Sequence, residues 1–245
     1  MTKVFAHRGA SAYAPENTMA AFRMAAEQNA DGVELDVQMT RDGELVVIHD
    51  ETVDRVSDGK GYVKNFTLEE LQSLSAHNHM EAYIGERIPT LKEVLELMKA
   101  EDMEVNIELK TGIFWYPDIE KKTAALVREM GMEKKVIYSS FNHYSIQKLK
   151  LLEEEAVTAY LFSDVILDVE RYAEITGVQG LHPAVYHLKM ADFLKRYQES
   201  PLAVRVWTVN QEEDIEAFMR AGVDAVITNY PDKAIRIREG LIEVC

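Results

Sequence analysis

A regular alternation of strand-like and helix-like segments constrains the fold of this 245-residue chain more than any other feature. Short apolar runs predict strands at 4–9, 32–37, 44–49, 105–110, 135–140, 157–162, 179–183, 202–209 and 223–229. Such alternation is typical of a parallel sheet with right-handed crossovers. When 44–49 is set aside as the antiparallel return of a hairpin, eight strands remain, each followed by a helix. That number predicts a closed (β/α)8 barrel, the TIM barrel, of the α/β class.

The helices of this pattern are recognised by apolar residues at helical spacing and by their caps. Thr18 and Thr90 are predicted N-caps of two early helices, and later helices are predicted at 119–130, 144–154, 169–175, 188–198, 211–220 and 232–239. An open, doubly wound sheet is the alternative fold. We disfavour it because no glycine-rich loop of the dinucleotide-binding type follows any predicted strand.

Residues 51–89 interrupt the alternation. The segment 58–61 has the composition of a loop, Thr67-Leu68-Glu69-Glu70 is a capping box that opens a short helix, and 75–86 is polar without a repeat. We interpret 51–89 as a lobe inserted after the hairpin, since it has too few apolar residues for a core of its own. The sequence therefore predicts one domain over 1–245. His77 and His79 in the lobe are either metal ligands or exposed loop histidines, and we favour the second.

The first hairpin concentrates charged residues. Glu34 and Asp36 alternate with apolar residues, so both carboxylates lie on one face of a strand. Asp42-Gly43 predicts a two-residue turn, which places Asp36 opposite His49 with Cβ atoms about 5 Å apart. A slip of one residue would turn His49 to the other face. From these residues alone, a surface hairpin with a solvated polar face is the alternative.

The carboxyl ends of the strands carry most of the remaining polar residues. Functional groups of a (β/α)8 barrel collect at this end, and the residues found there are His7, Arg8, Glu34, Asp36, Glu108, Lys110, Phe141, His182, Trp207, Thr228 and Asn229, with His49 from the hairpin. Because adjacent strand residues point in opposite directions, His7 and Arg8 both face this end only if the backbone turns at Gly9. Together these residues predict a catalytic site.

Three carboxylates, from Glu34, Asp36 and Glu108, are hard oxygen ligands that suit Ca²⁺ or Mg²⁺. His7 and His49 suit general acid–base catalysis, because an imidazole titrates near working pH.

Two cations and two aromatic residues complete the predicted site. Arg8 and Lys110 are donors suited to a phosphate group. Trp207 offers a flat apolar wall for a small polyol or headgroup, and packing in the barrel core is its alternative role. Phe141 is assigned with it to substrate binding.

The formal net charge of −15 argues against nucleic acid or an anionic membrane surface as a partner. The sequence shows no secretory segment and no run long enough to span a membrane, so we expect a cytoplasmic protein without stable membrane association. Cys245 is the single cysteine, which excludes an internal disulfide framework. Tyr62, Phe66 and Tyr83 in the lobe either seal the barrel mouth or contact a second copy, so a homodimer stays open.

Several motifs together resemble those of the glycerophosphodiester phosphodiesterase family. The resemblance runs from residue 4 to about 231 and includes His7-Arg8-Gly9, Pro15-Glu16-Asn17-Thr18, Glu34-Leu35-Asp36-Val37, Thr40-Arg41-Asp42-Gly43, Val46-Val47-Ile48-His49-Asp50, Ile107-Glu108-Leu109-Lys110, Val206-Trp207-Thr208-Val209-Asn210 and Ile227-Thr228-Asn229-Tyr230-Pro231. Two departures are the segment 53–57, where threonines are usual, and Asn229, where Asp is frequent. We expect neither to affect the chemistry.

The resemblance implies a metal-dependent hydrolase. By this resemblance, Glu34, Asp36 and Glu108 would hold one divalent cation, His7 and His49 would form the acid–base pair, and Arg8 and Lys110 would bind the phosphate. The expected substrates are glycerophosphodiesters such as glycerophosphocholine or glycerophosphoethanolamine, and the products are sn-glycerol 3-phosphate and an alcohol. The alternatives are a phospholipase-D-like enzyme acting on intact lipid and a non-catalytic phosphometabolite-binding barrel. The lobe is expected to cap the barrel, as it does in this family.

Overall fold

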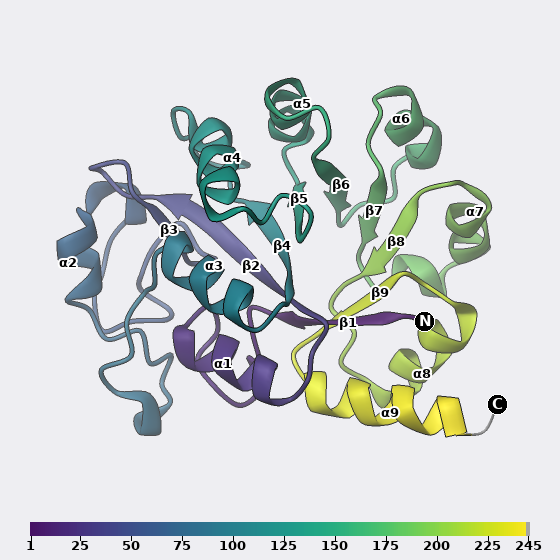
Figure 1. Cartoon of the computed structure of the whole chain (residues 1–245), viewed down its shortest axis with the longest axis horizontal. Helices are drawn as coiled ribbons and strands as arrows, with labels where there is room; N and C mark the ends of the chain where they lie inside the picture. Colours follow the sequence, from purple (N-terminus) through teal and green to yellow (C-terminus); the bar gives the residue numbers. More distant parts are fainter. Residues whose placement is uncertain (244–245) are drawn as a thin grey trace.

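The computed structural model describes residues 1–243, in which parallel strands form a closed barrel surrounded by helices (Figure 1). The strands of this part of the chain are β1 (Lys3–His7), β2 (Gly32–Met39), β3 (Leu45–Val47), β4 (Glu104–Leu109), β5 (Val136–Ser140), β6 (Val157–Phe162), β7 (Gly180–Pro183), β8 (Ala203–Val206) and β9 (Ala225–Thr228). Their order is β1-β9-β8-β7-β6-β5-β4-β2-β3, and β1 also pairs with β2, so the eight parallel strands close on themselves. The predicted (β/α)8 barrel is confirmed, and the open sheet is wrong.

Helices follow the strands around the outside of the barrel (Figure 1). They are α1 (Met19–Glu27), α2 (Leu68–Gln72), α3 (Leu91–Ala100), α4 (Ile119–Met130), α5 (His143–Leu152), α6 (Val169–Ile175), α7 (Phe193–Glu199), α8 (Glu212–Ala221) and α9 (Pro231–Glu243), with short 3₁₀ helices η1 (Val63–Asn65), η2 (Glu81–Tyr83) and η3 (His187–Lys189). No helix within residues 1–243 is both long and apolar enough to cross a membrane. Cys245 lies outside the described residues.

The strands are buried on both faces, as expected for parallel strands between a barrel interior and a helical layer. All eight residues of β2 are buried. The interior is filled by an apolar cluster of Phe5, Ile137, Ala159, Ala225 and Ile227. Two larger clusters lie between the strands and the helices. The polar site at the carboxyl ends of the strands therefore has an apolar floor.

Helix boundaries follow the predicted caps at most positions. Thr67 and Thr90 both form complete capping boxes, as predicted. The predicted helix at 188–198 is wrong in its first half, because the chain forms η3 and then, from Phe193, helix α7. Ala191, between them, has a left-handed backbone (φ 41°) that a continuous helix does not allow.

The predicted register of the hairpin is also wrong. Val37 pairs with Val47 and Met39 with Leu45, so Asp36 lies opposite Ile48, one residue from the expected partner His49. The connection is longer than a two-residue turn because Gly43 adopts φ 86°, as in a three-residue loop that ends in a bulge. His49 nevertheless reaches the site, since β3 ends at Val47 and frees the following residues from the strand alternation.

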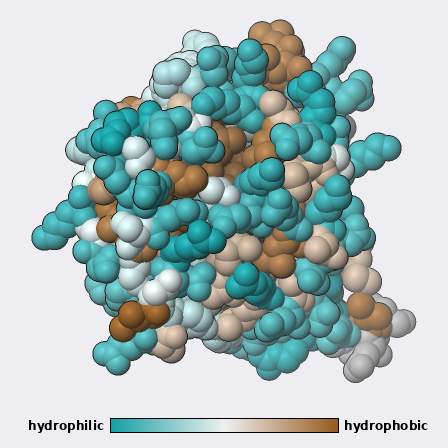
Figure 2. All heavy atoms as spheres, turned by 60° about the vertical axis from the view of Figure 1, so that its left-hand side comes forward, coloured by the Kyte–Doolittle hydropathy of each residue, from teal (hydrophilic) through white to brown (hydrophobic). Residues whose placement is uncertain are grey.

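The inserted lobe packs against the hairpin. Its buried residues Val53, Val56, Val63, Leu71, Ala76 and Ile88 form one cluster with Val46 and Ile48 of the hairpin. In the view that brings the lobe side forward, hydrophilic side chains cover most of the surface and apolar residues are exposed in separate patches (Figure 2). The small core of the lobe is thus shared with the strand that leads to His49.

Candidate active site at the carboxyl ends of the strands

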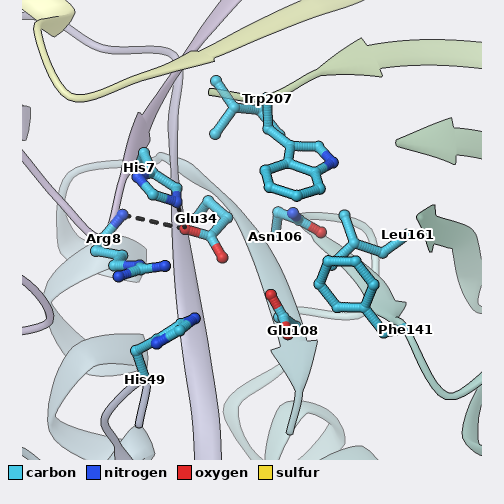
Figure 3. A pocket seen from close by; sticks show the side chains of 10 residues that line it. His7, Arg8, Glu34, His49, Asn106, Glu108, Phe141, Leu161 and Trp207 are labelled. Atoms are coloured by element: carbon cyan, nitrogen blue, oxygen red, sulfur yellow. Dashed lines mark hydrogen bonds and ion pairs between the residues drawn. The ribbon is translucent and has the colours of Figure 1, made fainter. Parts of the chain in front are cut away.

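A pocket of about 180 Å³ opens at the carboxyl ends of the barrel strands (Figure 3). Its lining residues are His7, Arg8, Glu34, His49, Asn106, Glu108, Phe141, Leu161, Trp207 and Ile227. One side is polar and carries the acids and imidazoles, and the other is apolar. The pocket brings together most of the predicted site residues, from segments far apart in the sequence.

The three predicted acids meet in this site. One carboxylate oxygen from each of Glu34, Asp36 and Glu108 lies within 4.8 Å of the others, and all three residues are buried. Parallel register brings them together, because Asp36 of β2 is the partner of Glu108 in β4. Glu34, two residues before Asp36, shares its face of the strand. Among the described residues, no other group of acids, histidines or cysteines has this geometry, so His77 and His79 are not part of one.

The charges of this acidic cluster are only partly balanced by protein groups. Lys110 Nζ donates to Glu108 Oε1 at 2.9 Å, and Arg8 Nε lies 3.3 Å from Asp36 Oδ2. Burial raises the pKa of Glu34 well above its usual value, and the neighbouring carboxylates of Asp36 and Glu108 raise it further. Burial also raises the pKa of Glu108, against the opposing effect of Lys110. A further positive charge is therefore favourable at this position.

The donor set fits a hard divalent cation. Asp36 Oδ1 is buried without a hydrogen-bond partner among the described residues, although Asp36 Oδ2 accepts a hydrogen bond from Asn17 Nδ2 at 2.8 Å. Burial alone would raise the pKa of Asp36, but the charges of Arg8 and Lys110 hold it below its usual value. Ionised carboxylates with a free oxygen are the ligands that Ca²⁺ and Mg²⁺ prefer.

His7 presents one ring nitrogen to the pocket. Its Nδ1 donates to Asn229 Oδ1 at 2.7 Å, and its Nε2 lies 3.9 Å from Glu34 Oε2. Burial, followed by the charge of Arg8, lowers the pKa of His7 to about 4. Asn229, the residue where the family frequently has Asp, therefore contacts a predicted site residue, and its amide oxygen selects the tautomer of this imidazole.

Hydrogen bonds with Asp50 and Gln38 hold His49 in place. Its Nδ1 donates to Asp50 Oδ1 at 2.6 Å, and Gln38 Nε2 donates to the His49 carbonyl oxygen at 2.9 Å. The side chain is 30% exposed. Burial raises the pKa of Asp50, but Arg55 and His49 outweigh this effect and lower the pKa to about 2. Each histidine thus donates through Nδ1, which leaves Nε2 for the pocket.

The backbone turn after β1 directs both His7 and Arg8 toward the site. Arg8 has φ 57° and Gly9 has φ 81°, so the turn begins one residue earlier than predicted. A Cβ at Gly9 would lie 2.7 Å from the carbonyl carbon and Cβ of Ala21 in α1. This position therefore requires glycine for its backbone and for its close packing.

Gly9→Ala should lower the free energy of unfolding by more than Gly222→Ala does. Both positions are left-handed, which costs alanine about 1–2 kcal/mol, but no atom lies within 4 Å of a Cβ at Gly222. The clash with Ala21 adds about 1–3 kcal/mol for Gly9→Ala. Denaturant unfolding of both variants measures the difference. Equal destabilisation would show that α1 yields to the extra methyl group.

The apolar side of the pocket contains the predicted aromatic pair. The rings of Phe141 and Trp207 are 5.6 Å apart in an edge-to-face arrangement, and Trp207 Nε1 donates to the His182 carbonyl oxygen at 2.8 Å. Leu161 of β6 extends the wall. His182 itself is fully buried and does not line the pocket; its Nε2 lies 3.4 Å from Arg205 Nη1. Its prediction as a site residue is not supported by this position.

Sequence reasoning missed several residues of the site. Asn106 lines the pocket, and its position two residues before Glu108 on the same strand face could have revealed it. Asn17, which donates to Asp36, lies in a loop without periodicity. Tyr62 and Tyr83 of the lobe do not line the pocket; Tyr62 packs on Phe114, and Tyr83 donates to the Tyr13 carbonyl oxygen.

Comparison with known sequences finds relatives along nearly the whole chain. The model of the glycerophosphoryl diester phosphodiesterase family matches residues 7–233. A glycerophosphodiester phosphodiesterase of Caldanaerobacter subterraneus is 44% identical over 98% of this chain and 99% of that protein. Another, of Bacillus altitudinis, is 40% identical over 98% of this chain and 99% of that protein.

Comparison with solved structures agrees. A phosphodiesterase of Oleispira antarctica, solved in complex with the product sn-glycerol-3-phosphate, has a TM-score of 0.87 at 30% identity. The similarity covers 98% of this chain and 97% of that one.

Proposed function

This chain belongs to the glycerophosphoryl diester phosphodiesterase family and is an enzyme of that class, and on this premise we propose that it hydrolyses deacylated phospholipids, such as glycerophosphocholine or glycerophosphoethanolamine, to sn-glycerol 3-phosphate and an alcohol. The observation that carries this proposal is the gathering of three buried carboxylates beside two imidazoles at one end of an apolar-walled pocket. The product complex of the Oleispira relative supports the glycerol phosphate half of the substrate.

Glu34, Asp36 and Glu108 would hold one divalent cation, Ca²⁺ or Mg²⁺. When bound, such a cation withdraws negative charge from a phosphoryl group. Arg8 and Lys110, which lie beside the same carboxylates, would attract and orient the phosphate oxygens. With such an ion bound, Arg8 and Lys110 would reverse the sign of an otherwise acidic site, as an anionic substrate requires.

His7 and His49 are the proposed acid–base pair. Each donates Nδ1–H to a fixed acceptor, so each directs Nε2 to the reacting groups. One imidazole accepts the proton of the nucleophile at Nε2, and the other, which must enter the step as an imidazolium, gives its Nε2 proton to the departing alkoxide. The nucleophile is either water or the glycerol hydroxyl of the substrate, and the second course passes through a cyclic phosphate. Phe141 and Trp207 would contact the apolar part of the substrate.

Hydrolysis of intact lipid is the second candidate function. The observation that favours it is an exposed aromatic pair near Phe141: Trp115 is 54% exposed and Tyr144 is 76% exposed, with ring centroids 6.4 Å apart. The binding-only alternative is not retained, because the chain is an enzyme.

We further propose one catalytic domain over 1–245, with the lobe at about 51–89 as part of it, since the lobe shares its core with the hairpin. The net charge of −15 supports a protein without a nucleic-acid partner. We also propose a cytoplasmic location without stable membrane association. The protein is either a monomer or a homodimer.

A product assay tests the proposed function. With Ca²⁺ or Mg²⁺ present, soluble glycerophosphocholine should yield glycerol 3-phosphate and choline, faster than a micellar phospholipid yields its headgroup. Detection of a cyclic phosphate at early times would identify the glycerol hydroxyl as the nucleophile. Release of phosphocholine, or turnover of the micellar lipid alone, would contradict the proposed reaction.

A further inference from the structure

Arg55 of the inserted lobe binds two carboxylates at once. Its Nε and Nη2 lie 2.7 and 3.0 Å from the two oxygens of Asp50. Its Nη1 and Nη2 lie 2.9 and 2.8 Å from the two oxygens of Glu16. Both contacts are bidentate, a geometry that the planar guanidinium provides and an ammonium group does not.

Each of these carboxylates continues to a residue of the proposed site. Asp50 Oδ1 accepts the Nδ1–H of His49 at 2.6 Å. Glu16 Oε1 accepts a hydrogen bond from Arg8 Nη1 at 2.9 Å. Arg55 is therefore the centre of a continuous network of hydrogen bonds that runs from the imidazole of His49 to the guanidinium of Arg8. This network joins three segments of the protein: the loop after β1, the residues after β3, and the lobe.

The two carboxylates of this network are less exposed than those of a typical surface ion pair. The side chains of Glu16 and Asp50 are only 13% and 27% exposed, and that of Arg55 is 42% exposed. Val53 and Val56, on either side of Arg55, are buried in the core shared with the hairpin and fix the backbone there. Within residues 1–243, the ion pairs of Asp50 are with Arg55 and His49 only. Without Arg55, Asp50 would lose the cation that opposes its rotation away from His49.

We propose that Arg55 is a positioning residue for the reaction, which orients His49 through Asp50 and Arg8 through Glu16. The inference rests on the proposed function of this site. It gives the lobe a role in the site, because one lobe residue sets the geometry of two groups that would face the phosphate. The segment 53–57, which departs from the usual family pattern, contains Arg55 itself.

Arg55→Met and Arg55→Lys test the proposal, with Arg41→Met as the matched control. Arg41 also connects hairpin and lobe, through Glu70 and the Asn65 carbonyl oxygen, but it contacts no residue of the pocket. Arg55→Met should lower kcat for glycerophosphocholine by about 10- to 100-fold, the usual effect of losing a group that orients a site residue. Arg55→Lys should recover only part of this loss, because one ammonium cannot satisfy both carboxylates. Arg41→Met should keep kcat within about twofold.

A double variant separates positioning from a merely structural role. If Arg55 acts on His49 through Asp50, adding Arg55→Met to Asp50→Asn should lower kcat by less than about twofold more. An increase in KM in both backgrounds is expected from the loss of Arg8 orientation. The proposal would be overturned if Arg55→Met and Asp50→Asn lowered kcat multiplicatively in the double variant. A wild-type kcat for Arg55→Met, or a loss of kcat in Arg41→Met equal to that in Arg55→Met, would also overturn it. Circular dichroism of every variant checks that it is folded.

This result is distinguishable from failure of the proposed function. If the wild-type protein does not hydrolyse the diester, or if His49→Ala hydrolyses it normally, the proposed function fails whatever Arg55 does. If the wild-type and His49→Ala proteins behave as expected, the Arg55 variants alone decide the inference.

Discussion

Replacing His49 with alanine should lower kcat for glycerophosphocholine by about two to four orders of magnitude, with little effect on the fold. The imidazole borders the pocket, and its tautomer is fixed by the Nδ1–H donated to Asp50 at 2.6 Å. No other imidazole among the described residues lines the pocket except His7. Steady-state kinetics with the soluble diester, at saturating Ca²⁺ or Mg²⁺, measures the loss.

His77→Ala is the matched control for this variant. His77 is a histidine of the neighbouring lobe that bonds to Ser75 and does not line the pocket, so its loss should leave kcat unchanged. Because the His49 side chain is part-exposed and outside the apolar clusters, the thermal midpoint of His49→Ala should stay within a few degrees of the wild-type value. Near-normal turnover in a folded His49→Ala protein would remove this residue from the mechanism.

The barrel and the meeting of the acids could be predicted because both depend on periodic features. Alternation along β2 and β4 defines which carboxylates face inward, and parallel pairing of neighbouring strands then brings Asp36 beside Glu108. Closure followed from the number of strand–helix repeats. These properties come from the backbone hydrogen-bond pattern, so they do not depend on details of the loops.

The errors and omissions lie where the backbone leaves such regular patterns. The observed hairpin register differs from the predicted one by one residue because Gly43 adopts a left-handed conformation. The sequence allows this conformation but does not require it. The contacts of Asn17, Glu16 and Arg55 join loop residues that no periodicity relates. Glu16 and Asn17 belong to a motif of the sequence, but their contacts are defined only by the tertiary structure.

The other large effect expected concerns the acidic cluster, in which Glu34→Gln should remove most of the stabilisation by Ca²⁺ or Mg²⁺. Protein treated with a chelator and then given metal at about 100 times its Kd should gain about 2.7 kcal/mol of stability. For a chain of this size that corresponds to a rise of roughly 5–11 °C in the thermal midpoint. Glu34→Gln should show less than a fifth of this rise, because it loses one of three charged ligands. Its turnover should also fall to that of the chelated wild-type protein.

The same substitution should not destabilise the metal-free protein. Burial and the charges of Asp36 and Glu108 raise the pKa of Glu34, which means that a neutral side chain is favoured there without metal. A glutamine resembles the protonated acid, and its oxygen can still accept the hydrogen bond that the Arg8 backbone N–H donates to Glu34 at 3.1 Å. We therefore expect the thermal midpoint of metal-free Glu34→Gln to equal or exceed that of the metal-free wild type.

Glu104→Gln provides the matched control, because it neutralises a glutamate at the opposite end of β4 that pairs with Lys3 outside the acidic cluster. Loss of a partly exposed pair of this kind costs about 0–1 kcal/mol, and the response to metal should remain as in the wild type. Opposite behaviour of the two variants would locate the cation at the cluster independently of any activity measurement. An undiminished metal response in Glu34→Gln would instead show that the ion binds elsewhere, and that the three carboxylates serve another purpose.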